Sequence, residues 1–239
     1  MRLIRLLPVV LLLFAGASQA DRLEPFSADF RLYRGDTTLG SATLSLVKDA
    51  DNCFVHSYTA KPSWLFRWAT GSISERSEFC VDNGRITPRF FRYHRSGVGA
   101  DDENFSLTFD AQQQTITDHN GVERAWEDGA VDRLAVQLEA LRLVEGMSFP
   151  VEERRLNVTV ADDDRTKQYT LAVTGEDTIS VPAGTFRTIR VERINDPKKT
   201  TRFWVAPELG YRLVQVEQQR KDDPVIGFSL KSLPSTPSP

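Results

Sequence analysis

Residues 26–34 read FSADFRLYR, and their apolar and polar side chains alternate. In an extended chain, one side would carry Phe26, Ala28, Phe30 and Leu32, and the polar residues between them would lie on the other side. Alternation of this kind is typical of a strand with one buried and one solvated face. Strands of that type favour an antiparallel sheet, because buried parallel strands are apolar on both faces.

The same two-residue period returns along the chain, and turn sequences separate the repeats. Alternating segments occur at 41–46 (SATLSL), 104–109 (NFSLTF) and 156–160 (LNVTV). Turn sequences occur at 34–36 (RGD), 82–84 (DNG), 119–121 (HNG) and 182–184 (PAG). The sequence therefore predicts roughly a dozen strands in one β domain.

One segment, residues 129–146, has helical spacing instead. Leu134, Leu138 and Leu141 would share a face of this helix, Asp128 could cap its start, and Gly146 is placed to end it. Further apolar residues extend around the cylinder, which favours a helix buried on more than one side. We therefore expect an all-β, mainly antiparallel single domain over residues 21–231, built as a curved or barrel-like sheet with this one main helix packed on its concave side.

The two ends of the chain have their own signals. Residues 1–20 combine basic Arg2 and Arg5, an apolar run too short to span a bilayer, and a small residue at Ala20, as in a secretory signal peptide cleaved after Ala20. We therefore expect a periplasmic protein with no transmembrane segment after cleavage. Residues 232–239 are rich in Pro and Ser, which predicts a disordered tail.

The chain has two cysteines, Cys53 and Cys80, and in an oxidising compartment an even number favours a disulfide over two buried thiols. If they face each other across a hairpin, opposed residue numbers sum to 133, which pairs Phe54 with Phe79.

The charge of the chain argues against nucleic acid as a partner. With 30 basic and 33 acidic residues and no basic block, the chain is a poor candidate for binding nucleic acid.

The disulfide would place residues 61–72 at the tip of the hairpin. This tip is unusually long and apolar, because it contains Trp64, Leu65, Phe66 and Trp68. A short helix from Pro62 to Gly71 would bring the two Trp residues onto one face. That face could cap the core, line a cavity for an apolar ligand, or contact a membrane or a partner.

The sequence carries no catalytic signature, and we expect neither catalytic residues nor a bound metal or cofactor. The spacing of His56, His94 and His119 does not indicate a metal site. A group of Glu75, Glu78 and His94 could act as acid and base, but outward-facing strand residues are the simpler interpretation. The acidic triplets at 101–103 and 162–164 are interpreted as solvated turns.

Trp204 is the remaining candidate contact. Residues 203–211 read FWVAPELGY, in which a strand ends at Pro207, Gly210 turns the chain, and Trp204 lies on the face opposite Phe203. An apolar residue on this second face could pack in the core, or it could line a ligand site.

Several stretches, in order, resemble the exported bacterial family called domain of unknown function 3108. They are SERSEF (74–79), ITPRFFRYHR (86–95), DRLAVQLEALR (132–142), EGMSFPV (145–151), VPAGTFRTIRVERI (181–194) and TRFWVAPELGYRLVQVE (201–217). The resemblance covers roughly residues 25–233 and implies an exported β-rich protein without known catalytic residues.

Three functions are consistent with these features. The first is a non-enzymatic periplasmic protein that binds an apolar or amphipathic envelope molecule, such as a lipid, in or near a barrel cavity. The second is a structural or interaction protein of the envelope that docks a protein partner through the aromatic tip. The third is a hydrolase with an unfamiliar site.

Overall fold

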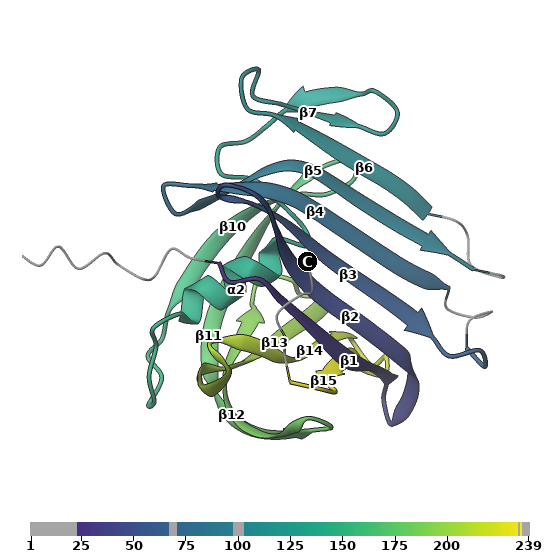
Figure 1. Ribbon diagram of the computed structural model, residues 1–239, viewed down its shortest axis with the longest axis vertical. Helices are drawn as coiled ribbons and strands as arrows, with labels where there is room; N and C mark the ends of the chain where they lie inside the picture. Colours follow the sequence, from purple (N-terminus) through teal and green to yellow (C-terminus); the bar gives the residue numbers. More distant parts are fainter. Residues whose placement is uncertain (1–22, 67–70, 98–102, 234, 236–239) are drawn as a thin grey trace, which may run out of the picture.

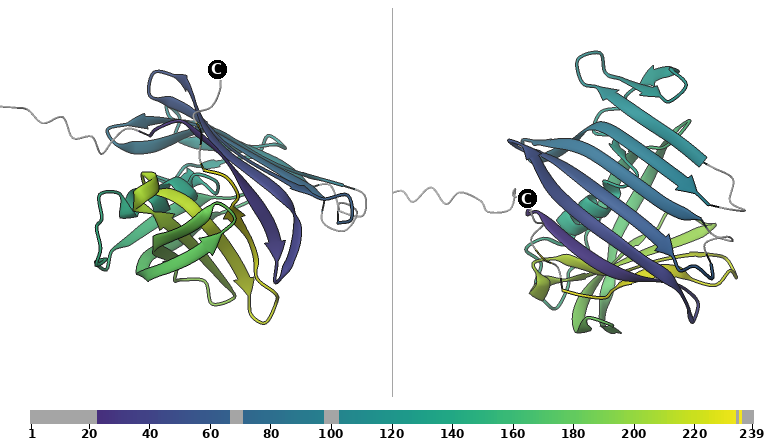
Figure 2. Two further views of the ribbon diagram at one scale, coloured as in Figure 1. Left: turned by 60° about the horizontal axis from the view of Figure 1, so that its bottom comes forward. Right: turned by 45° about the vertical axis from the view of Figure 1, so that its right-hand side comes forward.

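The computed structural model describes residues 23–66, 71–97, 103–233 and 235. In these residues one sheet of 15 strands curves around a single α-helix, α2 (Val136–Val144), as Figures 1 and 2 show. The first half of the sheet contains β1 (Phe26–Arg34), β2 (Thr37–Ala50), β3 (Cys53–Pro62), β4 (Ser72–Asp82), β5 (Arg85–Ser96), β6 (Glu103–Asp110), β7 (Thr115–Asp118) and β8 (Glu123–Ala125). The second half contains β9 (Val131–Asp132), β10 (Arg155–Ala161), β11 (Thr166–Val181), β12 (Gly184–Arg193), β13 (Lys199–Ala206), β14 (Arg212–Arg220) and β15 (Ile226–Leu230).

The sheet is antiparallel except at one end. Strands β1 to β8 pair in chain order, β10 to β15 do the same, and β1 joins the two halves by pairing with β15. Only β9 pairs in parallel, with β10, among the described strands. The end strands β8 and β9 are not hydrogen-bonded to each other, so the sheet is strongly curved but not closed. The predicted fold class is confirmed.

The helix fills the concave side of this sheet. Its buried residues are Val136, Leu138, Ala140, Leu141 and Val144. They pack with the inward-facing residues of the first strand, Phe26, Phe30 and Leu32, in one large cluster. Burying each large aliphatic or aromatic side chain contributes about 1.5–3 kcal/mol of transfer free energy, so this packing stabilises the helix against the inner face of the sheet.

The helix is shorter than the predicted segment 129–146. Its expected first turns are replaced by β9, which pairs Val131 with Val160. The carboxylate of Asp132 then accepts hydrogen bonds from the backbone N–H groups of Leu134 (2.9 Å) and Ala135 (3.0 Å). Asp132, and not Asp128, therefore satisfies the free N–H groups ahead of the helix, and the apolar residues before it belong to a strand and a turn. The expected stop before Gly146 is confirmed.

The hairpin of β3 and β4 has the predicted register. Cys53 and Cys80 are cross-strand partners joined by a disulfide, and Phe54 lies opposite Phe79 with ring centroids 5.9 Å apart. Pairing the two cysteines was enough to predict the register, because the numbers of opposed residues have the same sum along a regular antiparallel hairpin.

The chain termini lie mostly outside the described residues, including the whole of the expected signal peptide 1–20. Within the expected disordered tail, Ser235 forms two backbone hydrogen bonds with Ser27, of 2.8 and 2.9 Å. Among the described residues, no helix has the length and apolar character needed to cross a membrane.

Candidate functional site

The hairpin tip begins as a continuation of β3 and not as a helix. Pro62 is the last residue of β3, and the next residue, Ser63, donates its N–H to the carbonyl oxygen of Leu39 at 2.7 Å. Phe66 donates its N–H to the carbonyl oxygen of Ser63 at 3.0 Å, which closes a tight turn. The expected helix start at Pro62 is therefore wrong, because Pro62 remains paired in the sheet opposite Gly40.

Two apolar side chains of this turn face solvent, whereas a third is anchored. Trp64 is 78% exposed and Leu65 is 52% exposed. Phe66 is half-buried and packs against the large core cluster. Trp68 lies outside the described residues. We call Ser63–Phe66 the aromatic turn: it presents Trp64 and Leu65 to solvent on a backbone fixed by Ser63 and Phe66.

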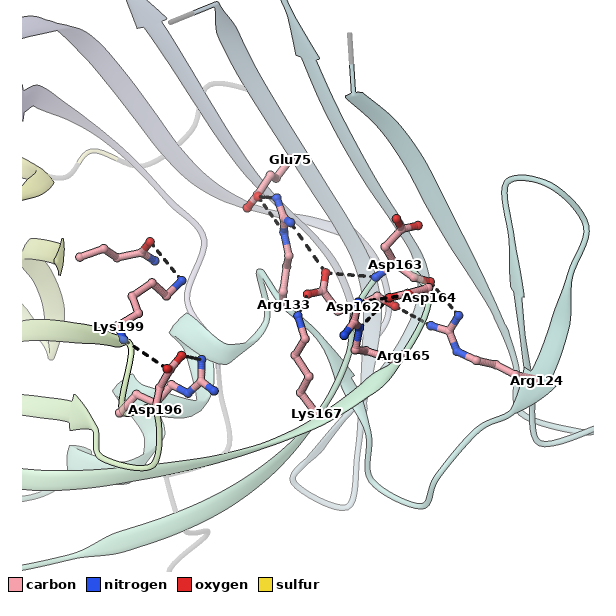
Figure 3. A network of polar contacts seen from close by, with 12 residues as sticks. Glu75, Arg124, Arg133, Asp162, Asp163, Asp164, Arg165, Lys167, Asp196 and Lys199 are labelled. Atoms are coloured by element: carbon pink, nitrogen blue, oxygen red, sulfur yellow. Dashed lines mark hydrogen bonds and ion pairs between the residues drawn. The ribbon is translucent and has the colours of Figure 1, made fainter. Parts of the chain in front are cut away.

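Farther along the concave face, charged side chains from separate segments meet (Figure 3). Arg133, between β9 and α2, donates to Glu75 of β4 with Nε at 3.0 Å from the carboxylate, and its Nη1 lies 3.8 Å from Asp162. Asp162 also binds Lys167 of β11. The Arg133 guanidinium stacks 4.2 Å from the ring centroid of Tyr93. We call Glu75, Arg133, Asp162 and Lys167 the inner ion-pair network.

The network favours the charged states of two of its members, Asp162 and Arg133. Burial raises the pKa of Asp162, but the hydrogen bond from Lys167 and the charge of Arg133 outweigh burial, so its pKa lies below the usual range. Burial likewise lowers the pKa of Arg133, and Glu75 and Asp162 reverse this effect. The network is therefore an ion-paired structure and not a site with a free acid or base.

Figure 3 also shows Lys199 of β13, which belongs to a second group of polar contacts together with Asp196. Its ammonium group is 3.3 Å from the side-chain oxygen of Gln218. Burial lowers the pKa of Lys199, and the charges of Arg193, Arg220 and Arg133 lower it further against the opposing effect of Asp196. The positive charge at Lys199 is therefore compensated only in part, by Asp196.

Comparisons with known proteins agree with this fold. The family model described as "Protein of unknown function (DUF3108)" matches residues 29–227. The chain belongs to the DUF3108 family. No curated protein matches it.

Among solved structures, the DUF3108 chain is similar to a beta-barrel-like protein of domain of unknown function DUF1849 from Brucella abortus. The identity is 12%, the TM-score is 0.54, and the match covers 91% of this chain and 99% of the other. A Bacteroides fragilis protein with a YmcC-like fold matches at 10% identity and a TM-score of 0.31, over 88% of this chain and 95% of the other, a likeness too low to support an argument. The first similarity extends to the fold alone.

Trp204 of the DUF3108 chain does not join the aromatic turn. It is buried on the face of β13 opposite Phe203, and its indole N–H donates to the carboxylate of Asp177 at 2.8 Å. The same carboxylate binds Arg190 at 2.8 Å. A buried indole whose N–H group is hydrogen-bonded is consistent with the first of the two expected roles of Trp204, core packing.

A second buried polar group lies between β4 and the start of α2. The hydroxyl of Ser77 donates to Asp132 at 2.5 Å, and both residues are fully buried. Burial raises the pKa of Asp132 to about 6, against the hydrogen bonds from Ser77, Ala135 and Leu134. Its role in the DUF3108 chain is to hold the chain at the entry to α2, since all of its contacts are internal.

His56, the cross-strand partner of Ser77, is also fully buried. Its Nδ1 lies 3.0 Å from the carbonyl oxygen of Ser45, and Gln137 lies near enough to raise its pKa. Burial outweighs both effects and lowers the pKa of His56 to about 4. His56 is therefore a neutral core residue near neutral pH.

The acid and base group considered from the sequence is not assembled. Glu78 binds Arg76 and His94 binds Asn104, whereas Glu75 lies on the other face of β4 with Ser77. The expectation that all three face outward is wrong for Glu75, which turns inward to Arg133. Among the described residues no cluster of His, Cys, Asp and Glu could hold a metal ion.

The inner ion-pair network is the feature that sequence reasoning missed. Asp162 belongs to the triplet interpreted as a solvated turn, yet its side chain is only 17% exposed because Arg133 and Lys167 bind it. Asp163 and Asp164 of the triplet are exposed, as expected. The position of Glu75 in the hairpin register was the available signal, because it shares a face with the buried Ser77 and Phe79.

Proposed function

We propose that this protein is a non-catalytic protein of the bacterial periplasm that binds an apolar or amphipathic envelope molecule through the aromatic turn. One observation carries the proposal: Trp64 is 78% exposed on a turn whose backbone is held to the sheet at Ser63 and whose Phe66 is packed into the core. A large aromatic residue left in water on a fixed support costs free energy that is recovered when a partner covers it.

The position of α2 favours binding at the aromatic turn over binding inside the sheet. Because α2 packs into the concave side, the position expected for an interior ligand is occupied by Leu138, Leu141 and their neighbours. An open pocket of about 440 Å³ is lined by residues before and within β10, by β11 and by Ile194, but by none from α2 or the aromatic turn. Surface binding at the turn is thus better supported than enclosure within the sheet.

The assignment to the periplasm rests on two supports. Residues 1–20 have the composition of a secretory signal peptide. The disulfide between Cys53 and Cys80 suits an oxidising compartment, because cytosolic thiols are kept reduced. Fractionation of cells that produce the full chain tests this part: the processed protein should appear in the periplasmic fraction with its N-terminus at Asp21.

A non-catalytic role is supported by the state of the polar groups. The two inward carboxylates Glu75 and Asp162 are both engaged by Arg133, and the carboxylate of Asp132 is enclosed in the core. A general acid or base must instead be able to reach a substrate.

Binding by wild-type protein and a double variant, Trp64→Ser with Leu65→Ser, tests the proposal. A fluorescent fatty acid should bind the wild type, and native mass spectrometry should show the adduct. The double variant should lose most of this binding. Val122→Ser is the matched control, because Val122 is 61% exposed on another turn. Equal binding by all three proteins would contradict the proposal.

A protein partner is the second candidate, favoured by the same fixed and exposed Trp, a residue enriched where proteins bind each other. Cross-linked envelope extracts distinguish the two. A protein that the wild type and Val122→Ser retain and the double variant loses, without any fatty-acid binding, would favour this second function.

A further inference from the structure

Lys199 and Arg220 form a like-charge pair across two strands. They are direct partners in the register of β13 and β14, so their side chains lie on the same face of the sheet. Like charges in this position destabilise a sheet. Among the described residues, neither side chain forms an ion pair with a carboxylate, and the Lys199 ammonium contacts only the neutral amide of Gln218.

The neighbouring cations are compensated, which makes this pair distinct. Arg193 binds Asp196 at 3.0 Å, with side chains 13% and 20% exposed. Arg133 and Lys167 bind the carboxylates of the inner ion-pair network. Asp196 is shared: it binds Arg193 and accepts the backbone N–H of Lys199 at 3.2 Å, but among the described residues no carboxylate forms an ion pair with the Lys199 ammonium.

The ammonium group of Lys199 is also partly buried. Burial is the largest cause of the lowered pKa of Lys199, and Arg193 and Arg220 are the next largest. A partly buried ammonium that is repelled by two guanidinium groups gains most from an incoming anion, because the anion relieves the repulsion and the lost hydration together.

We propose that Lys199, with Arg220 opposite it, binds the anionic oxygens of a phosphate or carboxylate group. This inference deepens the proposed function and rests on it where it names the ligand: an amphipathic molecule with an anionic head group. The head group would lie at Lys199 and the apolar part would extend toward the aromatic turn.

Strand β4 connects the inner ion-pair network with the hairpin that carries the aromatic turn. Glu75, which binds Arg133, is three residues from Ser72 at the start of β4, the strand that follows the hairpin tip. At the rise of an extended chain this is on the order of 10 Å. Ile73, which shares the inner face with Glu75, is only half-buried, and its cross-strand partner Ala60 is buried in the core.

Calorimetry with three probes tests the proposal: dodecyl phosphate, the uncharged dodecyl maltoside, and inorganic phosphate. Lys199→Gln removes the charge and keeps a polar side chain that is one methylene group shorter. Lys198→Gln is the matched control, since Lys198 is exposed and immediately precedes β13. Near-ultraviolet circular dichroism and thermal unfolding should show that both variants are folded.

The wild type should bind dodecyl phosphate more tightly than dodecyl maltoside. Lys199→Gln should weaken dodecyl phosphate binding roughly tenfold, as expected for one charge-assisted hydrogen bond, and leave dodecyl maltoside binding unchanged. Lys198→Gln should bind like the wild type. Equal affinities of Lys199→Gln and Lys198→Gln for dodecyl phosphate would overturn the proposal.

The remaining results separate this site from the aromatic turn. If dodecyl maltoside does not bind while dodecyl phosphate and inorganic phosphate bind with equal, Lys199-dependent affinity, the anion site stands and the apolar function of the turn fails. If both amphiphiles bind equally and only the double variant Trp64→Ser with Leu65→Ser weakens their binding, the anion site fails and the proposed function stands.

Discussion

The hydroxyl of Ser77 lies 2.5 Å from the carboxylate of Asp132, and this hydrogen bond joins the middle of β4 to the start of the helical segment. The same carboxylate accepts the N–H groups of Leu134 and Ala135. One buried acidic side chain therefore connects the sheet and the helix that fills it, at the point where the chain turns from β9 toward α2. We therefore expect the stability of the protein to depend on substitutions at this connection and on pH.

Ser77→Ala should destabilise the protein by about 1–3 kcal/mol at neutral pH, because the buried Asp132 loses a hydrogen-bond donor that its charged form needs. The free energy of unfolding in urea is the measurement. Ser74→Ala is the control, since Ser74 is exposed on the same strand and should change nothing measurable. Similar unfolding curves for the two variants would show that this hydrogen bond contributes little.

Asp132 and His56 should give the protein opposing pH dependences. The pKa of Asp132 is raised from 3.8 to about 6 by burial, so its contribution to stability is fully present below pH 3.8 and is lost as pH rises through about 6. Burial lowers the pKa of His56 from 6.5 to about 4, so its contribution is present above pH 6.5 and is lost as pH falls through about 4.

The two variants should therefore diverge on acidification between about pH 6.5 and 4. Asp132→Asn keeps an oxygen that can accept the helix N–H groups, but it removes the stability that Asp132 gains on protonation. The free energy of unfolding of this variant should therefore fall more on acidification than that of the wild type, because only the destabilising protonation of His56 remains. His56→Gln should show the reverse. Urea midpoints at a series of pH values measure both, and parallel curves for the three proteins would disprove the opposing contributions.

Arg133→Met should leave Glu75 and Asp162 facing each other without their shared cation. We expect a loss of about 1–3 kcal/mol, below the cost for a fully buried pair because the Arg133 side chain is 28% exposed. Adding Glu75→Gln should restore part of the loss, which a double-mutant cycle measures. Arg165→Gln, which breaks an exposed pair with Asp164, should have no measurable effect.

The sequence determined the strands better than the contacts between distant ones. Alternation placed Phe26 and Phe30 on the inner face, and the two cysteines set the register of β3 and β4, because both rules act within a strand or a hairpin. The helix was predicted too long, since the apolar residues before Leu134 fit a helix equally well until β9 pairs with β10.

The charged contacts of the candidate site could not be predicted from the sequence, because they join residues that are far apart in the chain. Glu75, Asp162 and Lys199 lie far apart in sequence, and only the curvature of the sheet brings them near Arg133. Each of the three has a charged side chain in a strand or turn, and such a side chain is predicted to face solvent when its partner is unknown. Trp64 was identified as a candidate because an aromatic cluster is visible in the sequence, but its exposure depends on Phe66 taking the buried position.

The aromatic turn should separate into a stabilising and a solvent-facing part. Phe66→Ala should cost about 1–3 kcal/mol, since Phe66 is half-buried against the core. Trp64→Ala should leave the free energy of unfolding within about 0.5 kcal/mol of the wild type, because the removed side chain makes few contacts in the folded protein. A large loss of stability for Trp64→Ala would assign the residue to the core and remove the basis of the proposed function.

The disulfide should be a main source of stability for the hairpin that carries the turn. It joins residues 27 apart, and in the chain-entropy model closing a loop of this length stabilises by about 3–4 kcal/mol. Replacing Cys53 and Cys80 together by Ala should lower the free energy of unfolding by that amount, as should reduction of the wild type. Because Phe54 still packs on Phe79, the register should persist, and far-ultraviolet circular dichroism should retain its strand signal. The reductant should not affect the double variant, and an unchanged unfolding midpoint on reduction of the wild type would show that the bridge does not constrain the unfolded chain.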